Sequence, residues 1–252
     1  MKRGILEARG LVRRFGGLTA VDRVDLRLDA GEALGLIGPN GAGKTTLFNL
    51  LAGQLRADDG SIRLLGREVQ GRPPHQICHL GLARTFQVPR PFLSLSVFDA
   101  VLVGARFGRA TPDQSPWSVA RGCLGRTGLT RRRHDPVGSL NLAERKRLDL
   151  ARAIASNPRV LLVDEAAAGL NPAEVRETVD LLRDIRDAGV GIVYVEHVME
   201  AVLELSDRVQ VLNQGGTIAV GAPDEVMRDP HVIEAYLGRA ARDRVVAEES
   251  SR

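Results

Sequence analysis

The first third of the chain alternates between apolar and polar positions and contains one continuous apolar run. Residues 5–37 have a strand-rich pattern, with alternation at 25–28 and an apolar run at 33–37. Alternation is typical of a strand with one buried face, and a short continuous run is typical of a fully buried strand. A helical pattern follows at 44–53, and alternation returns at 61–65. We therefore expect a β-rich region that leads into a buried strand and a helix.

In the second half of the chain, strand and helix patterns take turns. The expected elements are strands at 160–163 and 190–195 and helices at 173–188 and 199–205. This order is typical of parallel strands joined by helical crossovers. Alternating segments at 209–212 and 217–220 flank Gly215 and Gly216, which predicts a hairpin. The charged residues at 239–252 are expected to form a frayed helix.

The segment between these halves, residues 86–150, has a different character. Five prolines interrupt its short helical stretches: Pro89, Pro91, Pro112, Pro116 and Pro136. We interpret it as an inserted, mostly helical subdomain, with the weakest periodicity at 108–138. The expected organisation is one domain over 1–252, with a core at 1–85 and 151–238 and the helical subdomain at 86–150.

Size and composition limit the class of protein. The chain has 252 residues, 44% of them hydrophobic and 26% charged, as in ordinary globular proteins. No apolar run reaches the roughly 18 residues that a spanning helix needs, and the N-terminus has no leader-like apolar stretch. Two isolated cysteines do not form a disulfide framework or a metal site. These features favour a reducing cytosol.

The basic charge of the chain has two readings. The net charge is +4, from 32 arginines and only three lysines against 31 acidic residues. Nucleic acid or an anionic membrane could use this charge. However, the arginines are scattered, with one run at 131–133, and aromatic residues that could stack on bases make up only 4%. We therefore expect no nucleic-acid partner.

A complete phosphate-binding motif follows the buried strand. The nine residues are Gly38, Pro39, Asn40, Gly41, Ala42, Gly43, Lys44, Thr45 and Thr46. The first eight fit the pattern G-x-x-x-x-G-K-[ST], in which glycines let backbone N–H groups surround phosphates at a helix N-terminus. Lys44 is expected to reach the β- and γ-phosphates, and Thr45 to place its hydroxyl on Mg²⁺. The alternative is a glycine-rich turn that matches by chance. Such a turn would rarely contain the complete motif with a buried strand before it and a helix after it.

Ionisable side chains follow the next two buried strands. Asp164 and Glu165 follow the run at 160–163, and His197 follows the run at 190–195. Ligands bind at the carboxyl ends of parallel strands. We therefore expect Asp164 to meet Mg²⁺, Glu165 to orient or deprotonate an attacking water, and His197 to contact a γ-phosphate. Each residue alone would more often be solvated or structural.

These motifs occur in the order found in ABC ATPases, and the resemblance covers nearly the whole chain. It rests on 38–46, Gln87, 140–155, Asp164 with Glu165, and His197. The resemblance implies ATP and Mg²⁺ as cofactors, with Phe15 stacking on adenine and Gln87 sensing Mg²⁺ and the attacking water. An ordinary core Phe is the alternative for Phe15. The resemblance to ABC ATPases further implies a P-loop NTPase (ABC ATPase) α/β fold with an antiparallel β subdomain and an inserted helical subdomain.

Three segments resemble the ATP-binding subunits of branched-chain amino-acid importers: 83–87, 167–172 and 232–238. Urea and other amide importers share them, so these remain alternatives. A lipopolysaccharide-type exporter ATPase and a soluble, non-transport ABC ATPase also remain open. A nucleotide kinase or GTPase would share the phosphate loop but not Gln87 or the stretch at 140–153.

Two departures from the family pattern concern residues that meet a partner subunit. The usual signature Leu-Ser-Gly-Gly-Gln is replaced by Leu140 followed by Asn141, Leu142, Ala143 and Glu144, and an aspartate of the family is Asn171. Residues 141–144 are still expected to touch nucleotide, held by the opposite subunit. The resemblance implies a second ABC ATPase subunit, transmembrane permeases and, indirectly, a secreted binding protein. The chain would then be cytoplasmic and peripheral on the inner face of the membrane.

Overall fold

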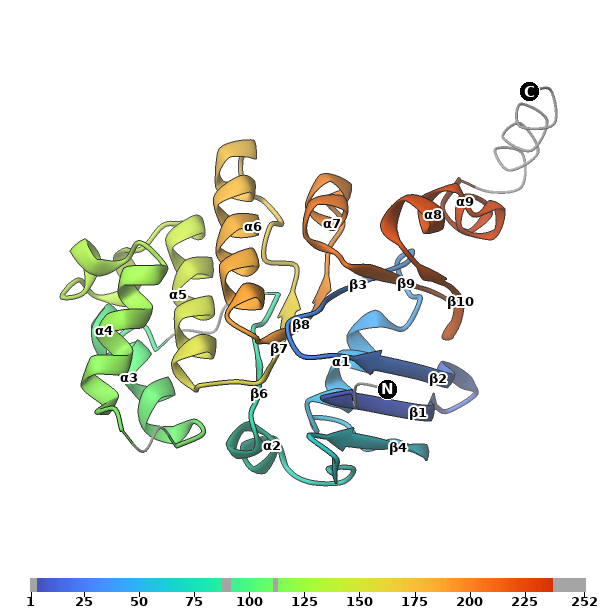
Figure 1. Cartoon of the computed structure of the whole chain (residues 1–252), viewed down its shortest axis with the longest axis horizontal. Helices are drawn as coiled ribbons and strands as arrows, with labels where there is room; N and C mark the ends of the chain where they lie inside the picture. Colours follow the sequence, from blue (N-terminus) through green and yellow to red (C-terminus); the bar gives the residue numbers. More distant parts are fainter. Residues whose placement is uncertain (1–3, 88–91, 111–112, 238–252) are drawn as a thin grey trace.

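Two β-sheets and a group of helices organise the chain in the computed structural model, which describes residues 4–87, 92–110 and 113–237 (Figure 1). The charged tail predicted at 239–252, together with Pro89, Pro91 and Pro112, lies outside the described residues. Within these ranges, no helix combines the length and apolarity needed to cross a bilayer.

The smaller sheet is antiparallel and lies at the N-terminal end of the chain. Its order is β2-β1-β4-β5, and its strands are β1 (Leu6–Phe15), β2 (Leu18–Leu28), β4 (Asp59–Leu64) and β5 (Arg67–Glu68). Along β2, Val24, Leu26 and Leu28 are buried and the residues between them are exposed. The alternation in the sequence therefore corresponds to a sheet with one buried face, as expected.

The larger sheet is mixed and carries the parallel strands. Its order is β10-β9-β3-β8-β7-β6, with β3 (Ala33–Ile37), β6 (Leu82–Arg84), β7 (Val160–Asp164), β8 (Gly191–Val195), β9 (Arg208–Asn213) and β10 (Gly216–Gly221). The strands from β6 to β9 are parallel, and β10 returns antiparallel to β9. Both the crossovers and the hairpin predicted from the sequence are confirmed.

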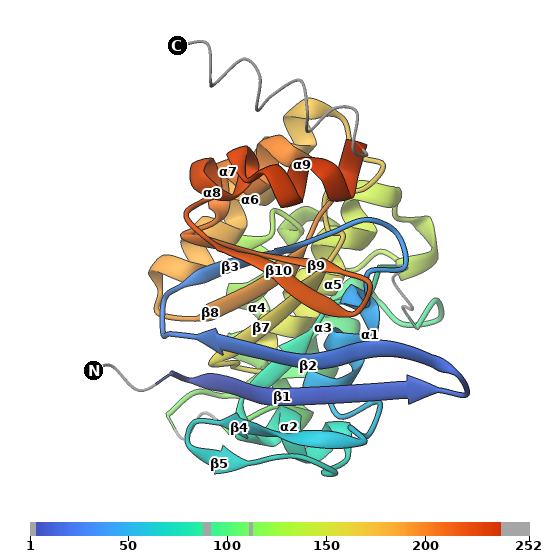
Figure 2. The ribbon, with the colours of Figure 1, turned by 90° about the vertical axis from the view of Figure 1, so that its right-hand side faces the viewer.

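The larger sheet lies between helices such as α6 (Pro172–Asp187) and α7 (Met199–Leu205) on one side and the antiparallel sheet on the other (Figure 2). A separate hydrophobic core lies on each of its faces. Along β7, Leu161 and Val163 belong to the core shared with the helices, whereas Val160 and Leu162 face the core shared with the antiparallel sheet. All five residues of β7 are buried. A strand buried on both faces needs apolar side chains at successive positions, which is why the sequence shows a continuous run rather than alternation.

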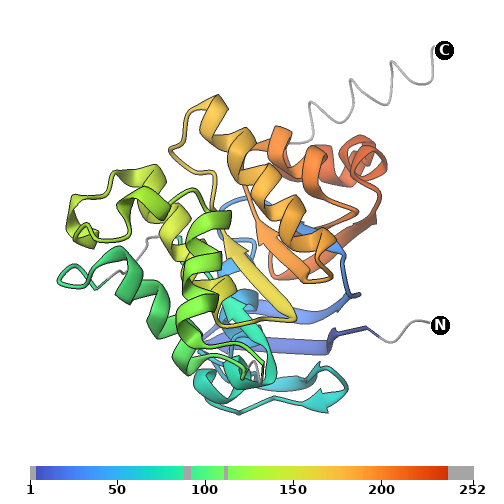
Figure 3. The same cartoon turned by 60° about the vertical axis from the view of Figure 1, so that its left-hand side comes forward.

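Helices cover both faces of the larger sheet (Figure 3). Helix α1 (Lys44–Leu51) contributes to the core between the two sheets. The other helices are α2 (Pro74–Leu80), α3 (Val97–Phe107), α4 (Pro116–Arg126), α5 (Leu142–Ala155), α6 (Pro172–Asp187), α7 (Met199–Leu205), α8 (Pro223–Arg228) and α9 (Pro230–Leu237). Two 3₁₀ turns, Thr130–Arg132 and Val137–Ser139, occupy the weakly periodic stretch.

Helices α3, α4 and α5 pack on one another and form the part that we predicted as a helical subdomain. The boundary at residue 150 falls inside α5, which continues to Ala155. Leu148 and Ile154 of this one helix lie in the same core as Val101 of α3. We therefore propose that the helical subdomain ends at Ala155 rather than at 150.

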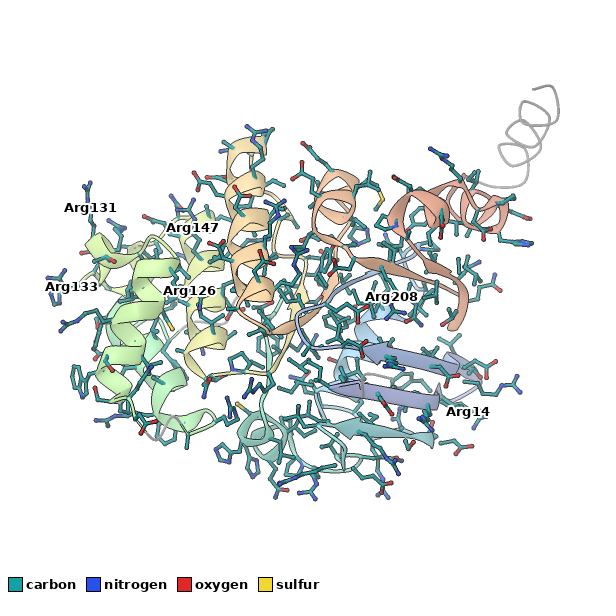
Figure 4. The ribbon with its side chains drawn as sticks, viewed as in Figure 1. Arg14, Arg126, Arg131, Arg133, Arg147 and Arg208 are labelled. Carbon is teal, nitrogen blue, oxygen red and sulfur yellow. The ribbon has the colours of Figure 1, made fainter. Side chains whose placement is uncertain are left out.

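Arginine side chains occur on the helical and on the β parts of the molecule. Figure 4 shows Arg126, Arg131 and Arg133 at the helical end, and Arg14 and Arg208 at the strands. The first three are exposed. Positive charge is thus present at both ends.

We predict opposite stability effects for two glycines of the helical subdomain. A Cβ at Gly104 in α3 would lie 2.4 Å from the backbone oxygen of Arg152 in α5, whereas a Cβ at Gly122 in α4 would meet nothing within 4 Å. Gly104→Ala should lower the free energy of unfolding by about 1–3 kcal/mol through overpacking. Gly122→Ala, the matched control, should raise it by up to about 1 kcal/mol through helix propensity. Urea denaturation of both variants measures this, and equal effects would contradict the close α3–α5 contact.

Candidate functional site

The phosphate-binding motif forms a tight loop between β3 and α1. Two of its glycines have backbone conformations that favour glycine, with φ of 150° at Gly38 and 103° at Gly43. A Cβ at Gly38 would lie 2.2 Å from the oxygen of Leu212, and one at Gly43 would lie 2.3 Å from the oxygen of Ala20. The loop is thus wedged between β9 and β2, so both glycines are required for steric reasons.

Lys44, at the first position of α1, is buried within this loop. It is 7% exposed, and its Nζ donates to the carbonyl oxygens of Gly38 at 2.5 Å and Pro39 at 3.0 Å. Burial lowers the pKa of Lys44, and the nearby charges of Glu165 and Asp164 act in the opposite direction. The ammonium group is therefore held by backbone carbonyls, within range of the negative charges of two carboxylates.

The carboxyl ends of three parallel strands lie beside this loop. In the register of the sheet, Leu36 pairs with Val195, and Val195 pairs with Asp164. The phosphate loop after β3, the carboxylates at the end of β7 and the histidine after β8 therefore leave the sheet at one edge, as the parallel order requires.

Glu165 is the centre of a small polar network. Its Oε2 accepts a hydrogen bond from Gln87 Nε2 at 2.8 Å, and its Oε1 lies 3.1 Å from His197 Nε2. Its backbone N–H donates to the oxygen of Val195 at 2.9 Å. The structure thus brings together three residues that are distant in sequence and that we predicted at one site.

Asp164 has a different environment from its neighbour. Its side chain is 5% exposed, and its Oδ2 accepts from Arg84 Nη2 at 2.8 Å. Arg84 is itself 8% exposed in its side chain and also donates to Asn49 Oδ1 and Gln54 Oε1. A buried carboxylate requires such a partner. One Asp164 oxygen is therefore engaged by a guanidinium that the sequence reasoning had missed.

Most of the predicted residues surround one cavity of about 720 Å³. Its lining comprises Phe15, Leu18, Thr19, Ala20, Asn40, Gly41, Ala42, Gly43, Lys44, Thr45, Thr46, Gln87, Glu165, His197 and Gln214. Gly38, Pro39 and Asp164 lie outside this lining, the first two holding Lys44. The volume is within the range of small-ligand sites.

Phe15 lies at the wall of this cavity rather than in the core. Its side chain is 43% exposed. The guanidinium of Arg13 lies over its ring, 4.8 Å from the centroid, and Arg13 is in turn paired with Asp58 at 2.8 Å. The ring is thus supported and presents aromatic surface to the cavity, an arrangement suited to stacking with a planar ligand.

Residues 141–144 do not line the cavity but form the N-terminus of α5. Asn141 Oδ1 accepts from the Glu144 N–H at 2.9 Å, and Glu144 Oε2 accepts from the Asn141 N–H at 3.0 Å. This capping box satisfies the helix end from within. Leu142 is 49% exposed, and Ala143 is buried. Asn171 caps α6 in the same way with Glu174, so both asparagines that depart from the family pattern are helix caps.

The residues at the cavity fit a magnesium ion carried by phosphates. Thr45 and Gln87, which line the cavity, offer a hydroxyl and an amide oxygen, and Glu165 offers a carboxylate. Mg²⁺ prefers oxygen ligands and often takes only one or two from protein. Among the described residues, no group of three or more His, Cys, Asp or Glu side chains could hold a metal alone. The donor set therefore matches a shared metal rather than a protein-only site.

Several lining residues were not predicted from the sequence. Thr19 and Ala20 of β2, and Gln214 of the β9–β10 turn, reach the cavity only because the two sheets meet there. The backbone N–H of Gly215 donates to the oxygen of Ala42, and the N–H of Asp22 donates to the oxygen of Gly215. These contacts join distant segments and leave no local sequence pattern.

Comparison with known proteins agrees with this geometry. The family described as "ABC transporter" matches residues 21–168, and the family described as "Branched-chain amino acid ATP-binding cassette transporter" matches residues 217–242. The chain is similar to the high-affinity branched-chain amino acid transport ATP-binding protein BraF of Pseudomonas aeruginosa, with 38% identity covering 95% of this chain and 100% of that protein.

Two further similarities bear on the alternatives. The lipopolysaccharide export system ATP-binding protein LptB of Acidithiobacillus ferridurans is 34% identical, covering 93% of this chain and 97% of that protein. The crystal structure of a nucleotide-free ATP-binding cassette from an ABC transporter superposes with a TM-score of 0.85, at 28% identity, covering 94% of this chain and 100% of that one. The match at 217–242 favours the branched-chain branch over the export branch. Its sequence and its fold identify this chain as a member of the ABC transporter ATP-binding family, in the branch of the branched-chain amino-acid transporters.

Proposed function

We propose that this chain is the ATP-binding and ATP-hydrolysing subunit of an ABC importer for branched-chain or other hydrophobic amino acids. The observation that carries the proposal is the cavity in which the buried Lys44 lies beside Glu165, Gln87 and His197. The match to the branched-chain family at 217–242 supports the substrate class.

Each residue of the cavity has a role that its chemistry supports. Lys44 and the loop N–H groups bind the phosphates. Thr45 and Gln87 at the cavity would hold Mg²⁺, which neutralises phosphate charge when bound, and the Asp164 oxygen that Arg84 does not engage would contact it from behind the cavity lining. Glu165 orients and deprotonates the attacking water. We assign to His197 the role of donating a hydrogen bond to the γ-phosphate, and its position 3.1 Å from Glu165 Oε1 supports this assignment. Phe15 stacks on the adenine.

We further propose that the chain works with partners. Its similarity to amino-acid transport ATP-binding proteins supports transmembrane permeases as partners, through which the chain would bind the inner face of the membrane. A second, distinct ABC ATPase subunit and a secreted binding protein complete the proposed importer. The self-capped end of α5 supports the choice of a distinct ATPase partner, because Leu142 and Ala143 place Cβ atoms where the family pattern has glycines.

The aromatic stacking predicts a loss of nucleotide affinity on truncation. Base–aromatic stacking contributes about 1–3 kcal/mol, so Phe15→Ala should raise the Kd for ATP roughly 10-fold. Phe15→Tyr, which keeps the ring, should bind nearly as the natural chain does. Phe107→Ala serves as the matched control, since Phe107 is 70% exposed at the end of α3 and does not line the cavity. Calorimetric titration with ATP would exclude the stacking role if Phe15→Ala bound with unchanged Kd.

The roles of Glu165 and Lys44 predict different defects. Glu165→Gln keeps the side chain's size but removes its charge and basicity, so ATP binding should persist while turnover falls about 10²–10⁴-fold. Lys44→Ala removes a phosphate partner, and turnover should fall about 10³-fold or more together with affinity. Nucleotide binding and hydrolysis are measured on the complex assembled with its permeases. Loss of ATP binding in Glu165→Gln would show that Glu165 is structural.

The altered signature at 141–144 predicts two unequal ATP sites in the heterodimer. The site formed by this chain's Lys44 and the partner's signature should hydrolyse ATP, and the site covered by Asn141 to Glu144 should be slower. Replacing 141–143 by Ser-Gly-Gly should speed hydrolysis at the slower site. Asn141→Ser alone is the control, because it keeps a cap but not the close approach that glycine allows. Single-turnover rates of ATP hydrolysis, measured separately at the two sites, test this prediction. Equal rates at both sites of the unsubstituted heterodimer would refute the asymmetry.

A further inference from the structure

The use of lysine in this chain points to a residue that the mechanism above leaves out. The chain has 32 arginines and three lysines. Lys2 lies outside the described residues, and the other two, Lys44 and Lys146, are both buried, at 7% and 8% exposure. Both donate from Nζ to backbone carbonyl oxygens at or near the cavity. A compact ammonium on a thin stem fits such a position, whereas the planar fork of arginine needs more room.

Lys146 contacts the residue that we assign as the catalytic base. It lies on α5, and its Nζ donates to the backbone oxygen of Glu165 at 2.7 Å. The same oxygen accepts a longer bond, of 3.3 Å, from the N–H of Ala168. Lys146 therefore binds the turn that follows β7 and does not itself line the cavity.

Glu165 needs such a restraint because its backbone is strained. Its φ is +48°, in the left-handed region that is costly for a residue with a side chain. Strain of this kind persists only where surrounding contacts hold it. The Glu165 N–H is held by Val195 and its carbonyl by Lys146, so both sides of the residue are fixed. This conformation directs the carboxylate toward Gln87 and His197.

A second buried charge holds the same turn from the other side. Glu196, which follows β8, is 4% exposed, and its Oε1 accepts from the Ala167 N–H at 2.7 Å. Burial lowers the pKa of Lys146 and raises that of Glu196, and the attraction between the two charges opposes both shifts. The turn at 165–168 is therefore held between α5 and the end of β8 by opposite charges.

We propose that Lys146 is a positioning residue for ATP hydrolysis, which holds Glu165 in its left-handed conformation so that the carboxylate faces the cavity. The inference rests on the proposed function only in taking Glu165 as the base.

The test compares Lys146→Met with Arg147→Met. Met has similar length and no donor, and Arg147 is the next residue of α5, pairs with Glu177 and does not line the cavity. In the assembled transporter, Lys146→Met should lower kcat at least about 10-fold while the KM for ATP changes less than about threefold. This is the pattern of a lost transition-state contact rather than lost binding. Arg147→Met should keep both values.

Hydrogen exchange gives a readout that needs neither nucleotide nor turnover. In the nucleotide-free chain, Lys146→Met should speed amide exchange in peptides covering 165–168, and Arg147→Met should not. Lys146→Gln, whose amide is one bond shorter and falls short of the carbonyl, is measured in the same way should Lys146→Met fail to fold. It should show the same loss of kcat and the same faster exchange.

The inference is overturned if Lys146→Met or Lys146→Gln keeps the kcat of the unsubstituted chain, or if Arg147→Met loses kcat to the same extent. Unchanged amide exchange at 165–168 in the Lys146 variants would also overturn it. A natural chain that does not hydrolyse ATP in the complex refutes the proposed function instead. In that case the exchange measurement alone decides whether Lys146 holds the turn.

Discussion

The hydrogen-bonded ladder of β3, β8 and β7 is the constraint on which the site depends. These strands are parallel, and their register places Leu36, Val195 and Asp164 side by side. Because all three strands point the same way, the loop after β3 and the acidic turn after β7 emerge at one edge. The cavity is then closed by β2 and the β9–β10 turn, which bring Ala20 and Gln214 to it.

Close packing around the phosphate loop ties this site to both sheets. The positions of Gly38 and Gly43 leave no room for a side chain against the backbone of Leu212 and Ala20. The antiparallel sheet therefore forms one wall of the cavity that we propose binds nucleotide. The same sheet supplies Phe15 and its supporting Arg13, so the surface proposed to bind the base and the loop proposed to bind phosphates come from different sheets that meet here.

The parts that could be predicted from the sequence are those that local patterns determine. The loop at 38–46, the apolar run at 160–163 and the hairpin around Gly215 all have short-range signatures, and each was located from the sequence. The contacts of Arg84 with Asp164 and of Lys146 with Glu165 join residues 80 and 19 positions apart, so no periodicity reveals them. We propose a division at Ala155 in place of 150 because α5 runs without a break from Leu142 to Ala155, and no local sequence pattern marks the end of the subdomain. For Lys146 a signal did exist, in the rarity of lysine among so many arginines.

The double burial of β7 has a consequence for how the chain folds. Every residue from Val160 to Val163 is apolar and fully buried, so sliding the strand by one position would still bury hydrophobic side chains on both faces. Hydrophobicity alone thus cannot distinguish the correct pairing from a shifted one. Polar contacts at the end of the strand make the distinction: the Asp164 N–H donates to Thr85 Oγ1, and the Asp164 carboxylate meets Arg84. A shifted strand would leave that carboxylate buried without its guanidinium. The polar contacts of Asp164 therefore distinguish the native strand alignment from a shifted one, so we expect substitutions at Asp164 to affect folding as well as the proposed site.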